Sequence, residues 1–440
     1  MTTEKKERYR FIIMILLSIV VGSTVGIVGS LFHMSVDWVE HSKLSALDYF
    51  WPFEHYKWLP YVVSSTVMIF IAIHLVRLVA PEARGSGIQE IEGVLEDKRE
   101  VNAIRTLFVK FFGGMLSLGS GMAMGREGPT VQIGGTLGQL LAETFHLKKD
   151  DLKTLIAAGA GAGLATTFNA PLAGILFVFE EMKKQFKYSY TSVQSVITAS
   201  IVSTIVLYLI MGNYIDIPIK DLLTPQVYDM WIFVIFGIFF GVFGYIFNIL
   251  LVAFSTFFAN LNSYAFNFII LIIGIGIGLL LWMHPESVGQ GYDVIHTTLS
   301  GTLPLGMLLL LFVVRFFVTM ISYGTGAPGG IFAPMLALGV LFGFAFGIIV
   351  QELIPGFAIE PAVFAVVGMS ALFSATVRAP LTGIVLVAEL TMSFSLLLPL
   401  LITSLVATIT VSAMGGRPIY TILLEKELEI AKFGRKKSNA

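Results

Sequence analysis

Long apolar stretches without charge dominate this sequence. Residues 230–285 contain no Asp, Glu, Lys or Arg. This stretch is long enough for two membrane-crossing helices, because one crossing needs about 20 apolar residues. Further charge-poor runs cover residues 11–34, 58–75, 197–212, 316–350 and 390–416. The pattern predicts an all-α fold, a polytopic membrane protein in which residues 1–440 form a single membrane domain.

Two blocks of the sequence occur twice, which indicates a tandem duplication. Block 159–180 matches block 368–389 without gaps, and both contain Ala-Pro-Leu-x-Gly-Ile and end in Glu. Upstream of each block, one spacing of Gly and Pro also recurs: Gly125, Pro129, Gly134 and Gly138 correspond to Gly330, Pro334, Gly339 and Gly343. We expect a first repeat over 11–212, a connecting segment over 213–227, a second repeat over 228–418 and a cytoplasmic C-terminal tail over 419–440.

The repeated blocks are too rich in Gly and Pro for straight helices across a whole bilayer. Duplicated membrane halves often insert with opposite orientation, and broken helices at their interface mark transport sites. We therefore expect two inverted-topology repeats. The alternative is that Gly and Ala only permit close helix packing. It explains less well why Gly and Pro cluster there with Ser, Arg and Glu.

Three glycine-rich segments, 85–90, 125–130 and 326–334, each precede a predicted helix start. Gly leaves backbone N–H groups uncovered. A helix N-terminus combines free N–H groups with a partial positive charge, so it attracts anions. Such neutral donors, helped by the hydroxyl of Ser86, hold an anion weakly enough for it to leave again, which transport requires.

Glu127 is the main candidate for a functional acid. It lies between two glycines in a segment expected at membrane depth, where a carboxylate is costly and indicates function. The ionised side chain imitates an anion and can fill the anion site, whereas the protonated side chain is neutral and can swing away. Glu127 is thus expected to be both gate and proton carrier. In the alternative, it only pairs with Arg126 and holds the loop.

Glu180 and Glu181 end the first repeated block, and the duplication separates their roles. Glu180 corresponds to Glu389, so we expect a structural role in both halves, such as capping. Glu181 corresponds to Leu390 and is particular to the first half, which suits an asymmetric task such as proton entry. The alternative is a solvated helix end beside Lys183, Lys184 and Lys187, and the residues alone do not favour either interpretation.

The sequence contains no motif that indicates another class of function. There is no H-E-x-x-H, no G-x-x-x-x-G-K-[ST] loop and no Cys, so we expect no metal site and no cofactor. The net charge of −1 indicates no nucleic-acid partner. An intramembrane enzyme that uses Glu127 with Ser or His lacks a nucleophile–base spacing, so we do not expect an enzyme.

Basic residues mark both ends of the chain. The N-terminal segment carries Lys5, Lys6, Arg8 and Arg10, and the C-terminal segment carries Lys426, Lys432, Arg435, Lys436 and Lys437. Cytoplasmic segments of membrane proteins are enriched in Lys and Arg. Both termini are therefore predicted to be cytoplasmic.

In combination, four segments resemble the CLC family of chloride channels and transporters, most closely its bacterial chloride/proton exchangers. The segments are Gly85-Ser-Gly-Ile, Gly125-Arg-Glu-Gly-Pro, Gly330-Ile-Phe-Ala-Pro and Gly416-Arg-Pro-Ile-Tyr420. The resemblance implies a homodimer in membrane lipid, one pore per subunit, and inverted halves built from many tilted and partial helices. It also implies that Ser86, Tyr420 and the backbone N–H groups of Ile331 and Phe332 bind the central chloride.

The resemblance also assigns the two acids and the mode of transport. Glu127 matches the external gate, and Glu181 matches the internal proton-transfer residue of the exchangers, which channels of the family usually lack. The implied function is secondary active exchange of chloride for protons. A passive voltage- or pH-gated chloride channel on the same scaffold is the alternative.

One position departs from the family pattern: Gln89 stands where Pro is usual, which restores a backbone N–H and loosens the backbone beside Ser86. Ser86 itself is typical of chloride selectivity, whereas nitrate-preferring relatives tend to carry Pro and fluoride exchangers differ in this loop. The sequence ends about 20 residues after Tyr420, without the nucleotide-binding domains of most eukaryotic relatives. A prokaryotic plasma (inner) membrane is therefore expected.

Overall fold

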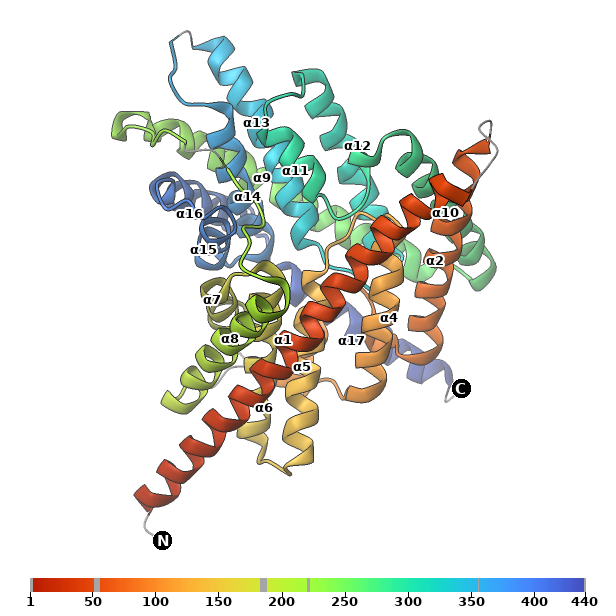
Figure 1. The fold of residues 1–440 in the computed structure, drawn as a ribbon, viewed down its shortest axis with the longest axis vertical. Helices are drawn as coiled ribbons and strands as arrows, with labels where there is room; N and C mark the ends of the chain where they lie inside the picture. The colour runs from red at the N-terminus through yellow and green to blue at the C-terminus, as the bar shows by residue number, and fades with distance from the viewer. Residues whose placement is uncertain (1–2, 51–55, 183–187, 220–221, 355, 439–440) are drawn as a thin grey trace.

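A computed structural model describes residues 3–50, 56–182, 188–219, 222–354 and 356–438, and Figure 1 shows its fold. The described residues form helices and no β-strand. In chain order they are α1 (Thr3–Phe50), α2 (Trp58–Val79), η2 (Pro81–Ala83), α3 (Ile88–Leu95), α4 (Ala103–Gly119), α5 (Glu127–Thr144), α6 (Lys149–Phe168), α7 (Pro171–Glu181), α8 (Tyr190–Met211), η3 (Val227–Asp229), α9 (Met230–Asn260), α10 (Ser263–Met283), η4 (Pro285–Ser287), α11 (Tyr292–Leu299), α12 (Leu305–Gly324), α13 (Phe332–Leu353), α14 (Pro361–Val377), α15 (Pro380–Thr391), α16 (Leu397–Ala413) and α17 (Ile419–Ser438).

The apolar runs form the helices that the sequence predicts. Seven of the described helices are long and apolar enough to cross a membrane, so the predicted all-α, polytopic class is confirmed. The run 230–285 divides into α9 and α10, because the side chain of Asn262 caps α10 by accepting the N–H of Ala265 (2.9 Å). The run 316–350 is interrupted between α12 and α13, where Gly326 takes a left-handed backbone (φ +79°).

The order of helices in the first half recurs in the second. Helices α1 to α8 correspond in order to α9 to α16, and η2 corresponds to η4. Helices α2 and α10 pack together, as do α7 and α15, which lie side by side in Figure 1. Helices α6, α13 and α14 are buried along nearly their whole length. The many short helices that cross at different angles match the expected architecture of partial helices.

Glu180 and Glu389 end the two repeated blocks, and each caps the N-terminus of a helix in the other half. Each carboxylate accepts two backbone N–H groups in the first turn of the other half's helix: Leu381 and Thr382 (3.1 and 2.6 Å) for Glu180, and Leu172 and Ala173 (3.1 and 2.8 Å) for Glu389. Such an exchange of equivalent contacts is what a two-fold axis produces. The capping role predicted for Glu180 is therefore observed.

Glycines allow the helices of each half to touch at the backbone. A methyl group on Gly159 of α6 would lie 2.1 Å from the carbonyl oxygen of Gly134 in α5. The corresponding pair in the second half is equally close, since a methyl group on Gly368 would lie 2.3 Å from the carbonyl oxygen of Gly339. These positions explain why the glycine spacing recurs in both repeats.

Gly159→Ala is therefore expected to lower the thermal stability of the protein in detergent. Overpacking at a backbone contact costs about 1–3 kcal/mol, because α5 and α6 must move apart. Thermal unfolding, followed by the fraction that stays monodisperse, measures this. The control is Gly276→Ala in α10, where a methyl group meets nothing within 4 Å. Equal melting temperatures for the two variants would contradict the packing argument.

Candidate functional site

The N-termini of α5 and α13 lie beside each other. Gly125 and Gly330, which precede these helices, form an antiparallel β-bridge with N–H···O distances of 2.8 and 2.6 Å. The first N–H groups of a helix have no intrahelical acceptor. One small region therefore receives free donors and a partial positive charge from both halves of the chain, as the glycine-rich segments predict.

Two buried hydroxyl groups border this region. The hydroxyl of Ser86 lies against Gly128 in the first turn of α5, since a methyl group on Gly128 would be 2.2 Å from it. The hydroxyl of Tyr420, in the first turn of α17, faces that of Ser86. Both side chains are fully buried, and neither hydroxyl has a hydrogen-bond partner among the residues that the structure describes. Buried hydroxyls are normally paired, so this arrangement fits an anion that accepts from them.

The start of α13 completes the site. Ile331 and Phe332 are fully buried, and the ring of Phe332 lies 6.0 Å from the ring of Tyr420 and 4.8 Å from that of Phe373. The structure thus brings Ser86, Ile331, Phe332 and Tyr420 together from α13, α17 and the loop before α3. Tyr420 belongs to the predicted C-terminal tail, whose first turn packs into the protein.

The side chain of Glu127 lies across the start of the other half's helix. It is fully buried, and its Oε2 accepts the N–H of Ala333 (3.4 Å) in the first turn of α13. Its Oε1 accepts the hydroxyl of Tyr292 (3.3 Å). An ionised Glu127 therefore takes the place of an anion at a helix N-terminus.

Arg126 makes its ion pairs elsewhere. Its guanidinium group lies 3.3 Å from the carboxylate of Asp37 and 3.8 Å from that of Asp216. Among the described residues, the ion pairs of Arg126 are with these two acids and not with Glu127.

Glu181 is the last residue of α7, and its side chain is half-buried. Helix α7 also contributes Phe177, whose ring centroid lies 6.1 Å from that of Phe332. The lysines 183, 184 and 187, on which the solvated-end alternative rests, lie outside the described residues.

Three further residues lie at this site that were not predicted from the sequence. Lys110 of α4 is fully buried, and its Nζ donates to the carbonyl oxygens of Ala83 and Gly85 (2.8 Å each), which fixes the loop that carries Ser86. Tyr323 of α12 places a buried, unpartnered hydroxyl against Gly85. Tyr292 contacts Glu127. A lysine alone in an apolar helix is the one signal that could have revealed Lys110.

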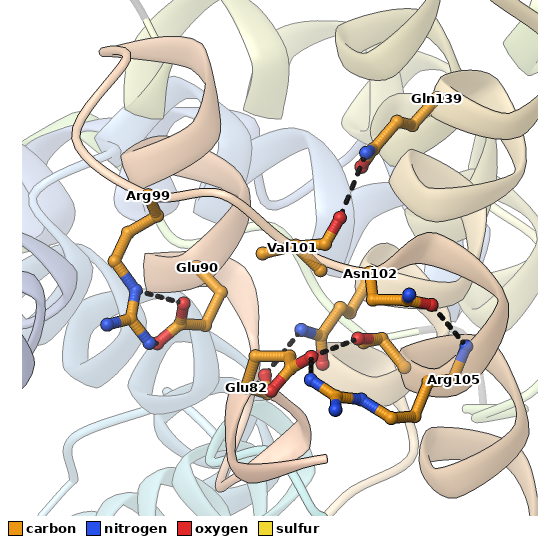
Figure 2. A network of polar contacts seen from close by, with 9 residues as sticks. Glu82, Glu90, Arg99, Val101, Asn102, Arg105 and Gln139 are labelled. Carbon is orange, nitrogen blue, oxygen red and sulfur yellow. Dashed lines mark hydrogen bonds and ion pairs between the residues drawn. The ribbon is translucent and has the colours of Figure 1, made fainter. Parts of the chain in front are cut away.

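A polar network holds the segment that leads into α3 (Figure 2). Arg99 donates two hydrogen bonds to Glu90 of α3 (2.7 and 2.9 Å), and Arg105 donates one to Glu82 (2.7 Å). Gln132 of α5 donates to the carbonyl oxygen of Glu82 (2.8 Å). These bonds tie the segment to its neighbours at several points.

Gln89 does not disturb the start of α3. The helix begins at Ile88, after Gly87 in a left-handed conformation (φ +83°). Gln89 is buried, and its Oε1 has no hydrogen-bond partner. The glycine and the network around it therefore define this turn without the proline that is usual in the family.

A cavity of about 300 Å³ is lined by Arg126 and Tyr292, the chain neighbour and a hydrogen-bond partner of Glu127. We call it the Arg126 pocket, after its central cation. Burial raises the pKa of the Asp216 carboxyl, in the connecting segment, to about 6. The pocket therefore has titratable groups next to the Glu127 segment; its polar lining includes His33, Asp37, Arg126, Tyr214, Asp216 and Tyr292.

Comparison with known proteins agrees with this geometry. Residues 68–412 match the model of a family described as voltage gated chloride channel. The chain is 46% identical over 424 residues to "H(+)/Cl(-) exchange transporter ClcA" of Vibrio cholerae serotype O1, covering 94% of this chain and 90% of the relative. The protein of the same name from Vibrio campbellii is 45% identical over 414 residues, covering 93% and 88%. The crystal structure of a slow cyanobacterial Cl-/H+ antiporter is similar with a TM-score of 0.91 and 38% identity, covering 94% and 98% of the two chains.

Proposed function

Because the chain belongs to the voltage-gated chloride channel (CLC) family, we propose that it is a secondary active transporter that exchanges chloride for protons across a membrane. The observation that carries this proposal is the position of Glu127, whose carboxylate lies at the N-terminus of α13. An acid there competes with a transported anion when ionised and leaves when protonated. Anion movement and proton movement are thus coupled through one side chain.

Chloride binds between the two halves in this proposal. The hydroxyls of Ser86 and Tyr420 and the backbone N–H groups of Ile331 and Phe332 hold it. Their convergence, and the lack of protein partners for both hydroxyls, support this assignment. All of these donors are neutral, so the ion is stabilised by partial charges and remains free to leave.

Protons reach the site by two acids on different elements. Glu127, beside the Arg126 pocket, is the external gate and takes protons from that side. Glu181, at the end of α7, passes protons from the cytoplasmic side. Its place at the end of α7, the helix whose Phe177 packs against Phe332, supports a role near the chloride site.

The protein acts as a homodimer in this proposal, in the lipid of a prokaryotic plasma (inner) membrane, with both termini cytoplasmic. All proposed chloride-binding and proton-transfer residues come from one chain, so each subunit contains a complete path. No cofactor, metal or nucleic acid takes part in the proposed cycle.

Chloride-driven proton movement in liposomes tests the proposal. Vesicles that contain the protein are loaded with high chloride, and valinomycin with potassium sets the voltage. Chloride efflux is expected to draw protons inward, so the pH of the weakly buffered outside rises without any initial pH gradient. Vesicles without protein are the control. If chloride leaves and the outside pH stays constant, and if the reversal potential ignores pH, the protein is a passive channel instead.

A further inference from the structure

Tyr292 lines the Arg126 pocket and contacts both Arg126 and its neighbour Glu127. It is the first residue of α11, in the second half of the chain, and its hydroxyl donates to Oε1 of Glu127 (3.3 Å). Its ring centroid lies 5.1 Å from the guanidinium carbon of Arg126, within the range of a cation–π contact. Its ring is thus placed by Arg126 while its hydroxyl is placed on Glu127.

Hydrogen bonds from Arg315 stabilise the loop that precedes Tyr292. Arg315 of α12 is almost fully buried, and it donates to three carbonyl oxygens of the loop. The acceptors are Glu286 (2.6 Å), Val288 (2.8 Å) and Gly289 (2.9 Å). The N–H of Gly289 also donates to the carbonyl oxygen of Gly121 (2.8 Å), shortly before Glu127. These hydrogen bonds fix the loop before Tyr292 and connect it to the segment that leads to Glu127.

Glycine is required at the last position of this loop. Gly291 has a φ of +109°, and a methyl group there would lie 2.7 Å from Nη2 of Arg315. The left-handed turn directs the chain into α11 directly after the loop. No residue with a side chain fits this turn without displacing Arg315.

The Tyr292 loop is the counterpart of the loop that carries Ser86. In the first half, Gly85 and Gly87 have positive φ and Lys110 holds the loop through its carbonyl oxygens. In the second half, Gly289 and Gly291 have positive φ and Arg315 holds the loop in the same way. The first loop brings a hydroxyl to the proposed chloride site, and the second brings one to the proposed gate.

We propose that Tyr292 is a latch on the gate: its hydroxyl holds Glu127 across the start of α13 and slows the opening of the anion site toward the Arg126 pocket. This inference rests on the proposed function, because it assumes that Glu127 must leave its place for an anion to pass. Tyr292 is a positioning residue in this scheme. It binds neither chloride nor a transferred proton.

Tyr292→Phe tests the latch because it removes the hydroxyl and keeps the ring over Arg126. A hydrogen bond to a charged group stabilises more than one between neutral groups. This bond is long, so chloride flux near neutral pH is expected to rise roughly threefold to tenfold. The half-maximal point of the pH profile is expected to move up by roughly one unit, because the ionised form of Glu127 loses a donor.

A control variant separates this effect from a general loosening of the pocket. Tyr214→Phe removes a buried hydroxyl in the same pocket that has no hydrogen-bond partner, and it is expected to leave rate and profile unchanged. The other charged and titratable groups that line this pocket are His33, Asp37, Glu40, His41, Asp216, Glu286, Asp293, His296 and Arg315. They are the same in both variants, so their titration cancels in the comparison.

The decisive measurement is Tyr292→Phe in a Glu127→Ala background, where no acceptor for the tyrosine hydroxyl remains. If the hydroxyl acts through the carboxylate, its removal has no effect on chloride flux once that carboxylate is gone. The latch is wrong if Tyr292→Phe alone leaves the flux and pH profile unchanged, if Tyr214→Phe shifts them equally, or if the increase persists without Glu127. Chloride flux alone decides these outcomes, so they stay distinct from a failure of proton exchange in the wild type.

Discussion

Replacing Glu127 with glutamine is expected to abolish proton movement while chloride continues to cross the membrane. Glutamine has the size of glutamate, and its one carbonyl oxygen can still accept from either Ala333 or Tyr292. It cannot bind and release a proton, however, and it carries no charge that competes for the N-terminus of α13. Chloride flux should therefore lose its pH dependence. Proton flux should fall at least about tenfold, to the leak of protein-free vesicles.

The same substitution at the far end of α5 provides the control. Glu143 is exposed and accepts a hydrogen bond from Gln139, so Glu143→Gln alters the charge of the same helix without touching the site. It is expected to keep the coupling of the wild type. Proton flux that persists in Glu127→Gln would remove Glu127 from the proton path and leave it a steric gate at most.

The positions of the helix starts could be predicted from sequence because they depend on local chemistry. Glycines at 125 and 330, each followed by proline four residues later, mark the first turns of α5 and α13. Which side chains meet there depends on packing between distant segments. Ser86 and Tyr420 are separated by more than 300 residues, and only the family resemblance places them together before the structure does.

Tyr292 and Arg315 illustrate a signal that was present but weak. The second half contains Gly289-x-Gly291, which repeats the spacing of Gly85-x-Gly87. A two-glycine match is common by chance, and the residues around it differ between the halves. Only the shared positive φ values and the buried cation behind each loop make the correspondence clear.

Glu180 and Glu181 show how far the comparison of two halves can reach. The partner of Glu180 in the second half predicts a structural role, and the exchanged caps display one. Glu181 has Leu390 as its counterpart, so no symmetric contact accounts for it. Membrane transport needs an asymmetric element, since the two sides of the bilayer supply protons to different residues.

Glu181→Gln is therefore expected to stop proton movement and to keep chloride movement, as Glu127→Gln does, but for a different reason. Glu127 stays in place in this variant and can still titrate from the side of the Arg126 pocket. Protons that reach it have no acid on the route past Tyr420, so the coupled cycle cannot close. Chloride flux should keep its dependence on pH on one side of the membrane, whereas Glu127→Gln should remove that dependence altogether.

The adjacent glutamate is the matched control for this prediction. Glu180→Gln weakens the cap on α15, because an amide offers one acceptor oxygen where the carboxylate offers two. A lost cap costs about 1 kcal/mol, so a lower melting temperature is expected, with chloride-driven proton flux intact. Glu180→Gln should thus lower stability and keep coupling, whereas Glu181→Gln should lose coupling. Two outcomes would contradict this prediction: Glu181→Gln pumps protons like the wild type, or Glu180→Gln loses coupling to the same extent. In either case the proton path does not run through Glu181. Only the gate at Glu127 is then left to couple the two ions.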